Sequence, residues 1–181
     1  MQKEIIAYFR GALGDATYSK MHKTWRYSQS NREWLLKLKD LLKKVDQRSW
    51  IYKEGKTRNL YILETTAKFL SETRAAEDRM TQAEKIAFVR GFFDAEGGVP
   101  RDVKARFYVQ LSQKNLEELT GIREILEGIG IQCGKMHNPS AKVDPNYWRF
   151  FVRACSYRDF IDKVGSWHPR KSKLLLSRVK I

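Results

Sequence analysis

Residues 88–98 read FVRGFFDAEGG, a run of apolar and small residues that ends in an acidic residue followed by two glycines. The pattern predicts a helix that ends near Glu96 and Gly97. An acidic residue is unfavourable at that end, because the last carbonyl groups of a helix carry partial negative charge and lack intrahelical partners. A bound metal cation would reconcile Glu96 with this position; the plainer alternative is a solvated helix end.

A second copy of this stretch lies near the N-terminus, where residues 8–16 read YFRGALGDA and place Asp15 at the position of Glu96. Other segments also recur in the same order. Residues 27–31 (YSQSN) reappear as 111–115 (LSQKN), and residues 65–70 (TTAKFL) parallel 156–161 (SYRDFI). The repeat predicts two similar halves, residues 1–78 and residues 79–181, joined by a short connector near residues 77–80.

Caps and periodicity predict the helices. Ser30 with Glu33, Asn115 with Glu118 and Thr81 with Glu84 have the spacing of N-terminal caps. Two helices have an apolar stripe at a period of 3.6 residues. These stripes are Leu35, Leu38, Leu41, Leu42 and Val45 in the first half, and Leu119, Ile122, Leu126 and Ile129 in the second.

Between the helices, apolar and polar residues alternate at 24–28, 105–113 and 147–154, which predicts strands with one apolar face. The apolar positions are Trp25, Tyr27, Phe107, Val109, Leu111, Trp148, Phe150 and Val152. The other face is polar and basic and is left uncovered. We therefore expect an α+β fold of two pseudo-symmetric αββαββα halves with antiparallel sheets.

Small residues at turn spacing, Gly11 with Gly14 and Gly91 with Ala95, allow the two motif helices to pack closely at a central interface. Such packing would bring Asp15 and Glu96 together. Two adjacent carboxylates repel each other unless cations intervene, and hard divalent ions prefer oxygen ligands. We expect Mg²⁺, with Mn²⁺ or Ca²⁺ as substitutes for binding, held by Asp15 and Glu96 with the carbonyl groups of Gly14 and Ala95.

The two stretches resemble the LAGLIDADG motif of homing endonucleases, and the chain resembles the monomeric type with two motifs. Gly91 matches the first glycine, Glu96 the metal-binding acid and Gly97 the last glycine. The first copy departs from the pattern at Arg10, Leu13 and Ala16 but keeps Asp15. The resemblance implies a saddle of two antiparallel sheets on double-stranded DNA, and cleavage of a long, pseudo-palindromic site. An intron-encoded origin, as in archaeal ribosomal-RNA introns, or a free-standing gene is expected.

The resemblance also implies roles for individual residues. Asp15 and Glu96 would hold the metals, one for each strand cut, and Gln29 and Gln113 would hold the water network around them. Lys171, followed by Lys173, is the candidate for a basic residue beside the scissile phosphate; Arg74 and Arg79 are the candidates in the first half. The plainer alternatives are a glutamine that ends a strand and a basic tail on the last helix. Candidates for contacts in the DNA groove are Arg26, Ser28, Arg106, Tyr108, Gln110, Arg149 and Arg153.

The composition agrees with a polyanionic partner. The 181 residues contain 35 Lys and Arg against 21 Asp and Glu, a net charge of +14, and neutralising phosphates releases condensed counterions. Cys133 and Cys155 have no metal-binding spacing and are expected to be reduced, and His22, His137 and His168 are scattered. Without a signal or membrane-spanning pattern, we expect a cytoplasmic protein.

Three other functions remain open at this point. The same scaffold could be a maturase that binds intron RNA, or a DNA-binding protein without catalysis. A basic RNA-binding protein of another fold is the third, although it leaves the repeat unexplained.

Overall fold

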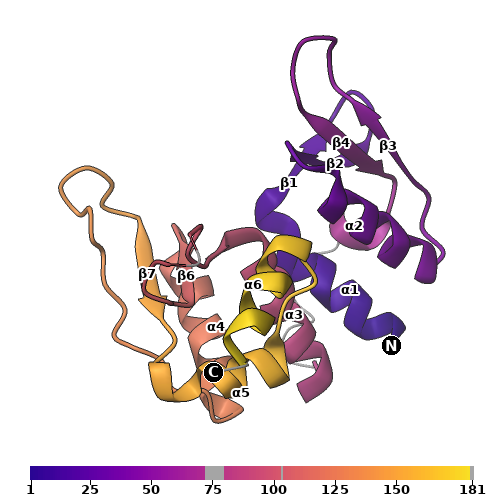
Figure 1. The fold of residues 1–181 in the computed structure, drawn as a ribbon. Helices are drawn as coiled ribbons and strands as arrows, with labels where there is room; N and C mark the ends of the chain where they lie inside the picture. The colour runs from indigo at the N-terminus through magenta and orange to yellow at the C-terminus, as the bar shows by residue number, and fades with distance from the viewer. Residues whose placement is uncertain (72–79, 103, 180–181) are drawn as a thin grey trace.

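The computed structural model describes residues 1–71, 80–102 and 104–179. Two helices, α1 (Gln2–Gly11) and α3 (Gln82–Glu96), lie side by side at the centre. Figure 1 shows one antiparallel sheet at the upper right of this pair and a second at its left. The arrangement confirms the expected α+β class with two antiparallel sheets and a central helix pair.

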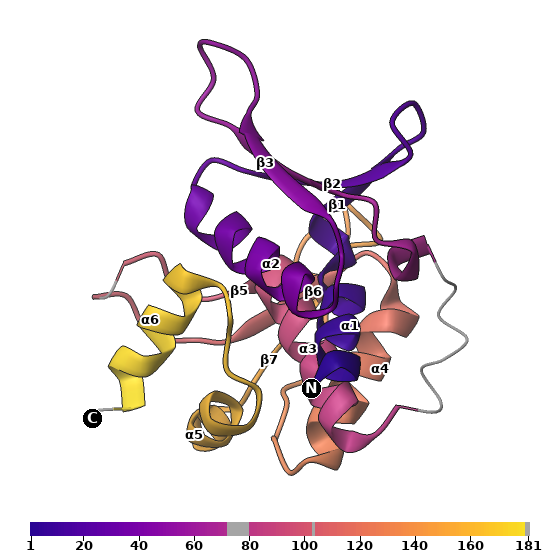
Figure 2. The ribbon, with the colours of Figure 1, turned by 90° about the vertical axis from the view of Figure 1, so that its right-hand side faces the viewer.

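The first half continues from α1 into a 3-10 turn, η1, and then alternates strands with one helix. Its elements are η1 (Ala12–Asp15), β1 (Ala16–Ser19), β2 (Thr24–Gln29), α2 (Arg32–Lys44), β3 (Ser49–Lys53), β4 (Tyr61–Thr65) and the 3-10 turn η2 (Lys68–Ser71). The strands form the first sheet in the order β1-β2-β4-β3. Helix α2 packs under one face of this sheet, as Figure 2 shows, and the opposite face is called its outer face.

The second half repeats this order with shorter strands. Its elements after α3 are β5 (Gly97–Gly98), β6 (Gln110–Gln113), α4 (Leu116–Gly128), β7 (Trp148–Phe151), a 3-10 turn (Ala154–Ser156), α5 (Tyr157–Asp159), a π-helical turn (Phe160–Val164) and α6 (Pro169–Val179). Strands β5, β6 and β7 form the second sheet in that order, and α4 packs on its inner face. Two isolated antiparallel β-bridges, between Cys133 and Val152 and between His137 and Arg149, take the place of a fourth strand.

The strand register supports the repeat. Ala16 pairs with Tyr27 in the first sheet, and Gly97 pairs with Leu111 in the second. The predicted strand over 105–113 is too long, however, because β6 begins at Gln110. Its partner β5 ends at Gly98, which pairs with Gln110, so the preceding residues have no β5 residue beside them. The predicted boundary between residues 78 and 79 lies outside the described residues.

The caps are confirmed in two of three cases. Asn115 accepts the Glu118 N–H at 3.2 Å, and Thr81 forms a capping box with Glu84. The predicted cap at Ser30 is wrong, because Asn31 is the N-cap of α2 instead and accepts the Glu33 N–H at 2.8 Å.

The predicted apolar stripes of α2 and α4 are buried, except that Ile129 is half-buried. Both cysteines are free thiols; Cys133 is buried and Cys155 is exposed. In the described part of the chain, no helix is both long and apolar enough to cross a membrane.

Candidate functional site

The two predicted acids lie at the ends of the central elements. Asp15 is the last residue of η1, and Glu96 is the last residue of α3. A Cβ atom added to Gly14 would lie 2.1 Å from Oε1 of Glu96. The Glu96 carboxylate therefore lies directly against the backbone that carries Asp15, and only a glycine leaves it this space.

Both carboxyl groups sit where their charged forms are unfavourable. Burial raises the pKa of Asp15, and the nearby Lys171 ammonium opposes that shift. Burial also raises the pKa of Glu96, and repulsion by Asp15 and by Glu118 adds to it, again against Lys171. The protein thus brings two acids together and leaves them short of positive charge, which is the electrostatic condition that a divalent cation relieves.

The two predicted glutamines are placed differently. Gln29 donates from Nε2 to Oδ2 of Asp15 at 3.3 Å. Gln113 instead accepts the Lys114 N–H at 2.7 Å, and no contact with Glu96 is found for it in the described residues. Ser112 donates to the Glu96 carbonyl oxygen at 3.3 Å. The structure therefore brings Gln29 to its acid and leaves Gln113 turned away.

Lys171 occupies a place that the sequence did not predict. Its side chain is only 4% exposed, and Nζ donates to the carbonyl oxygens of Phe93 (2.7 Å), Asp94 (2.8 Å) and Gly97 (2.7 Å). An ammonium group has three N–H donors, so none is left for a phosphate. Lys171 therefore supplies the positive charge at the C-terminal end of α3. Its three hydrogen bonds leave no donor for the direct phosphate contact that the sequence predicts. Lys173 is exposed, and Arg74 and Arg79 lie outside the described residues.

Asp94 is a residue whose role the sequence reasoning missed. Its buried carboxylate accepts hydrogen bonds from the Tyr8 hydroxyl at 2.7 Å, the Ser166 hydroxyl, and the N–H groups of Trp167 (2.8 Å) and His168 (3.0 Å). These last N–H groups precede the N-terminus of α6, where negative charge is favourable. Asp94 of α3 thus binds the backbone just before α6, and Lys171 of α6 binds the backbone at the end of α3. The sequence signal for Asp94 was its position in the motif, two residues before Glu96.

The donor set suits a hard cation that keeps several waters. The described residues contain no group of three or more His, Cys, Asp and Glu that could enclose a metal ion. Two carboxylates and the adjacent carbonyl groups are what the site offers, and Mg²⁺ is commonly bound through one or two carboxylates with retained water. Lys171 binds the carbonyls of Phe93, Asp94 and Gly97 but not that of Ala95, the predicted ligand. The residues therefore fit a divalent ion.

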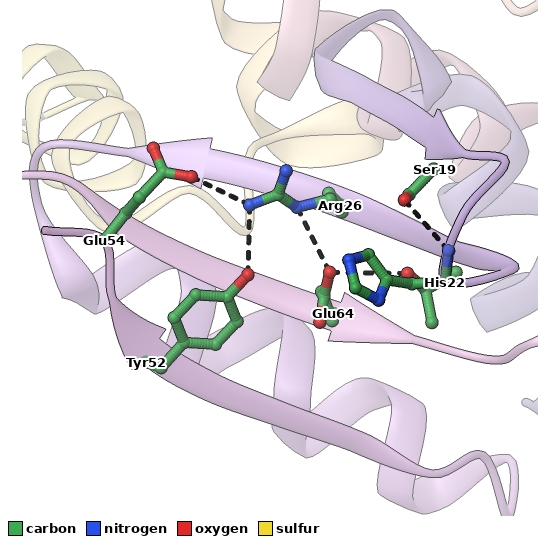
Figure 3. A network of polar contacts seen from close by, with 7 residues as sticks. Ser19, His22, Arg26, Tyr52, Glu54 and Glu64 are labelled. Atoms are coloured by element: carbon green, nitrogen blue, oxygen red, sulfur yellow. Dashed lines mark hydrogen bonds and ion pairs between the residues drawn. The ribbon is translucent and has the colours of Figure 1, made fainter.

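The outer face of the first sheet carries a network centred on Arg26, shown in Figure 3. Nη2 of Arg26 lies 2.9 Å from Oε1 of Glu54 and 3.0 Å from the Tyr52 hydroxyl. Nε lies 3.1 Å from Oε1 of Glu64, a contact close enough for an ion pair but not aligned as a hydrogen bond. The expectation of a simply basic face is wrong here, because cross-strand pairing places Glu64 opposite Arg26. Ser28, on the same face, is exposed.

The candidates of the second half lie around the outer face of the second sheet. Tyr108 packs edge-on against Phe151, and Gln110 is 3.5 Å from the Tyr147 hydroxyl. Arg149 donates from Nε to Nε2 of His137 at 3.1 Å. The exposed Arg106 precedes β6, and the exposed Arg153 bends back to the Cys133 carbonyl at 3.3 Å.

Known proteins match both the sequence and the fold. Residues 83–165 match the model of the LAGLIDADG-like domain. The homing endonuclease I-ApeI of Aeropyrum pernix is 35% identical over 92 residues, which cover 50% of this chain and 39% of that protein. The chain thus spans about two fifths of the length of this curated relative.

Two solved structures extend the comparison to the whole fold. I-DmoI in complex with DNA and Mn has a TM-score of 0.68 at 18% identity, over 91% of this chain and 98% of that one. Full-length DUF199/WhiA from Thermatoga maritima has a TM-score of 0.69 at 15% identity, over 100% of this chain and 62% of that one. At these identities the matches establish the fold alone, and an unrelated RNA-binding fold is excluded. Residues 83–165 thus resemble a LAGLIDADG-like domain in sequence, and the chain as a whole shares the fold of these solved structures.

Proposed function

We propose that this protein is a site-specific DNA endonuclease of the homing type, which makes a Mg²⁺-dependent double-strand break in a long, pseudo-palindromic target. The relatives support the proposal by their names. I-ApeI is called a homing endonuclease, and I-DmoI has been solved with DNA and Mn and with DNA and Ca, and a variant of it with target DNA and Mg.

The observation that carries the proposal is the pair of acids at the central helix ends. Asp15 and Glu96 come from different halves, lie together, and both have a raised pKa because they are partly buried. A purely structural site would gain stability by replacing one of them with a neutral residue. Retaining both makes sense when the pair holds cations that a reaction requires.

In this proposal Asp15 and Glu96 hold the metal, with the carbonyl groups of Gly14 and Ala95 beside them. A bound divalent ion supplies an activated water and stabilises charge on the phosphate and the leaving oxygen. Gln29, held at 3.3 Å from Asp15, orients that carboxylate and the water around it. Lys171 fixes the end of α3 that presents Glu96 and keeps positive charge near both acids.

DNA binding would use the outer faces of the two sheets and the loops beside them. The net charge of +14 favours a phosphate backbone. The loop between β3 and β4 carries the exposed residues Lys56 and Arg58, and Figure 1 shows that this loop projects from the first sheet. Because one chain supplies both acids and both sheets, a monomer is sufficient.

The test is cleavage of a plasmid that carries the intron-lacking host locus, in Mg²⁺, in Ca²⁺ and in EDTA. The double variant Asp15→Asn, Glu96→Gln is compared with a matched double variant at exposed acids, Asp40→Asn, Glu124→Gln. We expect Mg²⁺-dependent linear product from wild type and the matched control, and none from the site variant.

Salt-sensitive duplex binding without cleavage would overturn the endonuclease assignment in favour of DNA binding alone. Tight binding of intron RNA without cleavage of DNA would instead favour a maturase.

A further inference from the structure

Arg26 and Arg149 both lie on outer sheet faces, but their guanidinium groups have different partners. Arg26 faces two carboxylates and a phenol through its Nε and Nη2 edge. Both N–H groups of Nη2 are used by Glu54 and Tyr52, so only Nη1 is left for another molecule. One cation between two carboxylates also leaves this cluster with a net negative charge, which disfavours a close phosphate. Figure 3 shows these three side chains along the Nε and Nη2 edge of the guanidinium.

Arg149 is held by neutral groups. Its Cζ atom lies 5.3 Å from the centroid of the Phe151 ring, and the His137 ring stacks on the same ring at 6.1 Å and 22°. Because arginine can only donate, Nε2 of His137 must accept, which places the imidazole proton on Nδ1. Nδ1 lies 3.3 Å from the Lys135 carbonyl, a suitable acceptor for that proton. The two contacts thus fix both the position and the tautomer of His137.

These contacts leave the end of the Arg149 guanidinium open. Among the described residues, no acceptor is found for its Nη1 or Nη2, and no carboxylate pairs with it. The two terminal nitrogens form a fork that matches the O6 and N7 acceptors of guanine in the major groove. Holding the fork in place before binding reduces the side-chain entropy that would otherwise be lost.

We propose that Arg149 reads one guanine in the half-site under the second sheet, that His137 and Phe151 are positioning residues for it, and that Arg26 reads no base. The inference rests on the proposed function and adds to it which residue recognises one base of the target. Arg26 instead ties β2, β3 and β4 together, since its partners come from β4, from β3 and from the residue that follows β3.

The test is selection of randomised duplexes by the full chain in Ca²⁺, followed by sequencing of the bound fraction. Arg149→Lys keeps the charge and removes the fork. We expect the preference of this variant for guanine at one position to fall about tenfold. Its affinity for non-matching DNA and the salt dependence of that affinity should stay unchanged. His137→Leu is expected to lose part of the preference at the same position, and His137→Gln, whose amide oxygen can accept from Nε, to restore it. Arg26→Lys is expected to change no base preference.

The outcomes separate the two proposals. An unchanged selection profile for Arg149→Lys overturns the assignment of a guanine to Arg149. A guanine preference lost in Arg26→Lys overturns the claim that Arg26 reads no base. Neither result contradicts the proposed function. Failure of the wild-type chain to enrich any sequence overturns the proposed function and this inference together. Thermal unfolding of each variant confirms that the selected protein is folded, so that a profile change reports recognition.

Discussion

Gly11 and Gly91 hold the two central helices in backbone contact. A Cβ atom on Gly11 would lie 1.9 Å from the Phe88 carbonyl oxygen, and one on Gly91 would lie 1.9 Å from the Tyr8 carbonyl oxygen. The two glycines thus occupy equivalent positions across the helix pair, each against the backbone of the other helix. Aligning Asp15 with Glu96 in the sequence instead pairs Gly91 with Arg10, one position out of step.

The change from α-helix to 3-10 helix accounts for the missing position. Asp15 lies four residue steps after Gly11 along the 3-10 turn, which correspond to a rise of about 8 Å and a rotation of about 480°. Glu96 lies five residue steps after Gly91 along the α-helix, which correspond to a rise of about 7.5 Å and a rotation of about 500°. The two acids therefore reach similar heights and directions although their spacings differ by one residue.

We expect Gly11→Ala and Gly91→Ala each to destabilise the fold by about 3 kcal/mol, because a backbone carbonyl cannot move aside without separating the helices. The matched control is Gly121→Ala in α4, where a Cβ would meet nothing within 4 Å. The control should be stabilising by about 1 kcal/mol through helix propensity. Urea unfolding measures all three, and a neutral effect at Gly11 and Gly91 would contradict the close contact.

The raised pKa values of Asp15 and Glu96 predict a stability that depends on pH. The folded state holds these protons more tightly than the unfolded state, so the contribution of these two groups to metal-free stability is greatest below the ordinary carboxyl range and is lost as the pH rises through the raised values. The variant Asp15→Asn, Glu96→Gln should lack this fall and melt roughly 2 °C higher at pH 7. Ca²⁺ should stabilise wild type only. If the melting temperatures of the two proteins changed in parallel from pH 4 to pH 8, repulsion between Asp15 and Glu96 would be contradicted.

Replacing Lys171 should affect both the fold and the acids. Lys171→Met leaves three carbonyl groups without their donor, and we expect a loss of about 3 kcal/mol in the free energy of unfolding. Because Lys171 lowers the pKa of Asp15 and of Glu96, its loss should also move the pH midpoint of Ca²⁺ stabilisation upward. Lys173→Met, at an exposed position, is expected to change stability by less than about 0.5 kcal/mol.

Another outcome would support the direct contact between Lys171 and a phosphate that the sequence predicts. If Lys171→Met kept wild-type stability and DNA affinity but lost cleavage, the ammonium group would have to act on the phosphate directly.

Tyr27 offers a separate test of the core. Its side chain is fully buried, its hydroxyl has no hydrogen-bond partner among the described residues, and burial with the nearby charge of Asp15 raises its pKa. Tyr27→Phe removes the unpaired hydroxyl without changing the ring, so it should stabilise the protein by about 1 kcal/mol. Unfolding in urea measures the change. A destabilised variant would reveal a partner for the hydroxyl, such as a bound water.

The sequence by itself determined the features that depend on neighbouring residues. The apolar stripe of α2, the caps at Thr81 and Asn115, and the two acidic helix ends follow from local periodicity and capping chemistry. These signals lie within a few turns of chain, where helix and strand geometry fix which residues share a face. The α+β class and the repeat could therefore be predicted.

Only the tertiary structure decided which partners the charged side chains take. Lys171 caps α3 and Asp94 caps the start of α6 because those two ends meet in space, and Arg26 is neutralised because Glu64 lies opposite it on the next strand. Gln113 likewise pairs with the Lys114 N–H rather than with Glu96. Long polar side chains satisfy their hydrogen bonds with whichever groups the packed backbone brings within reach, and one-dimensional spacing does not contain that information.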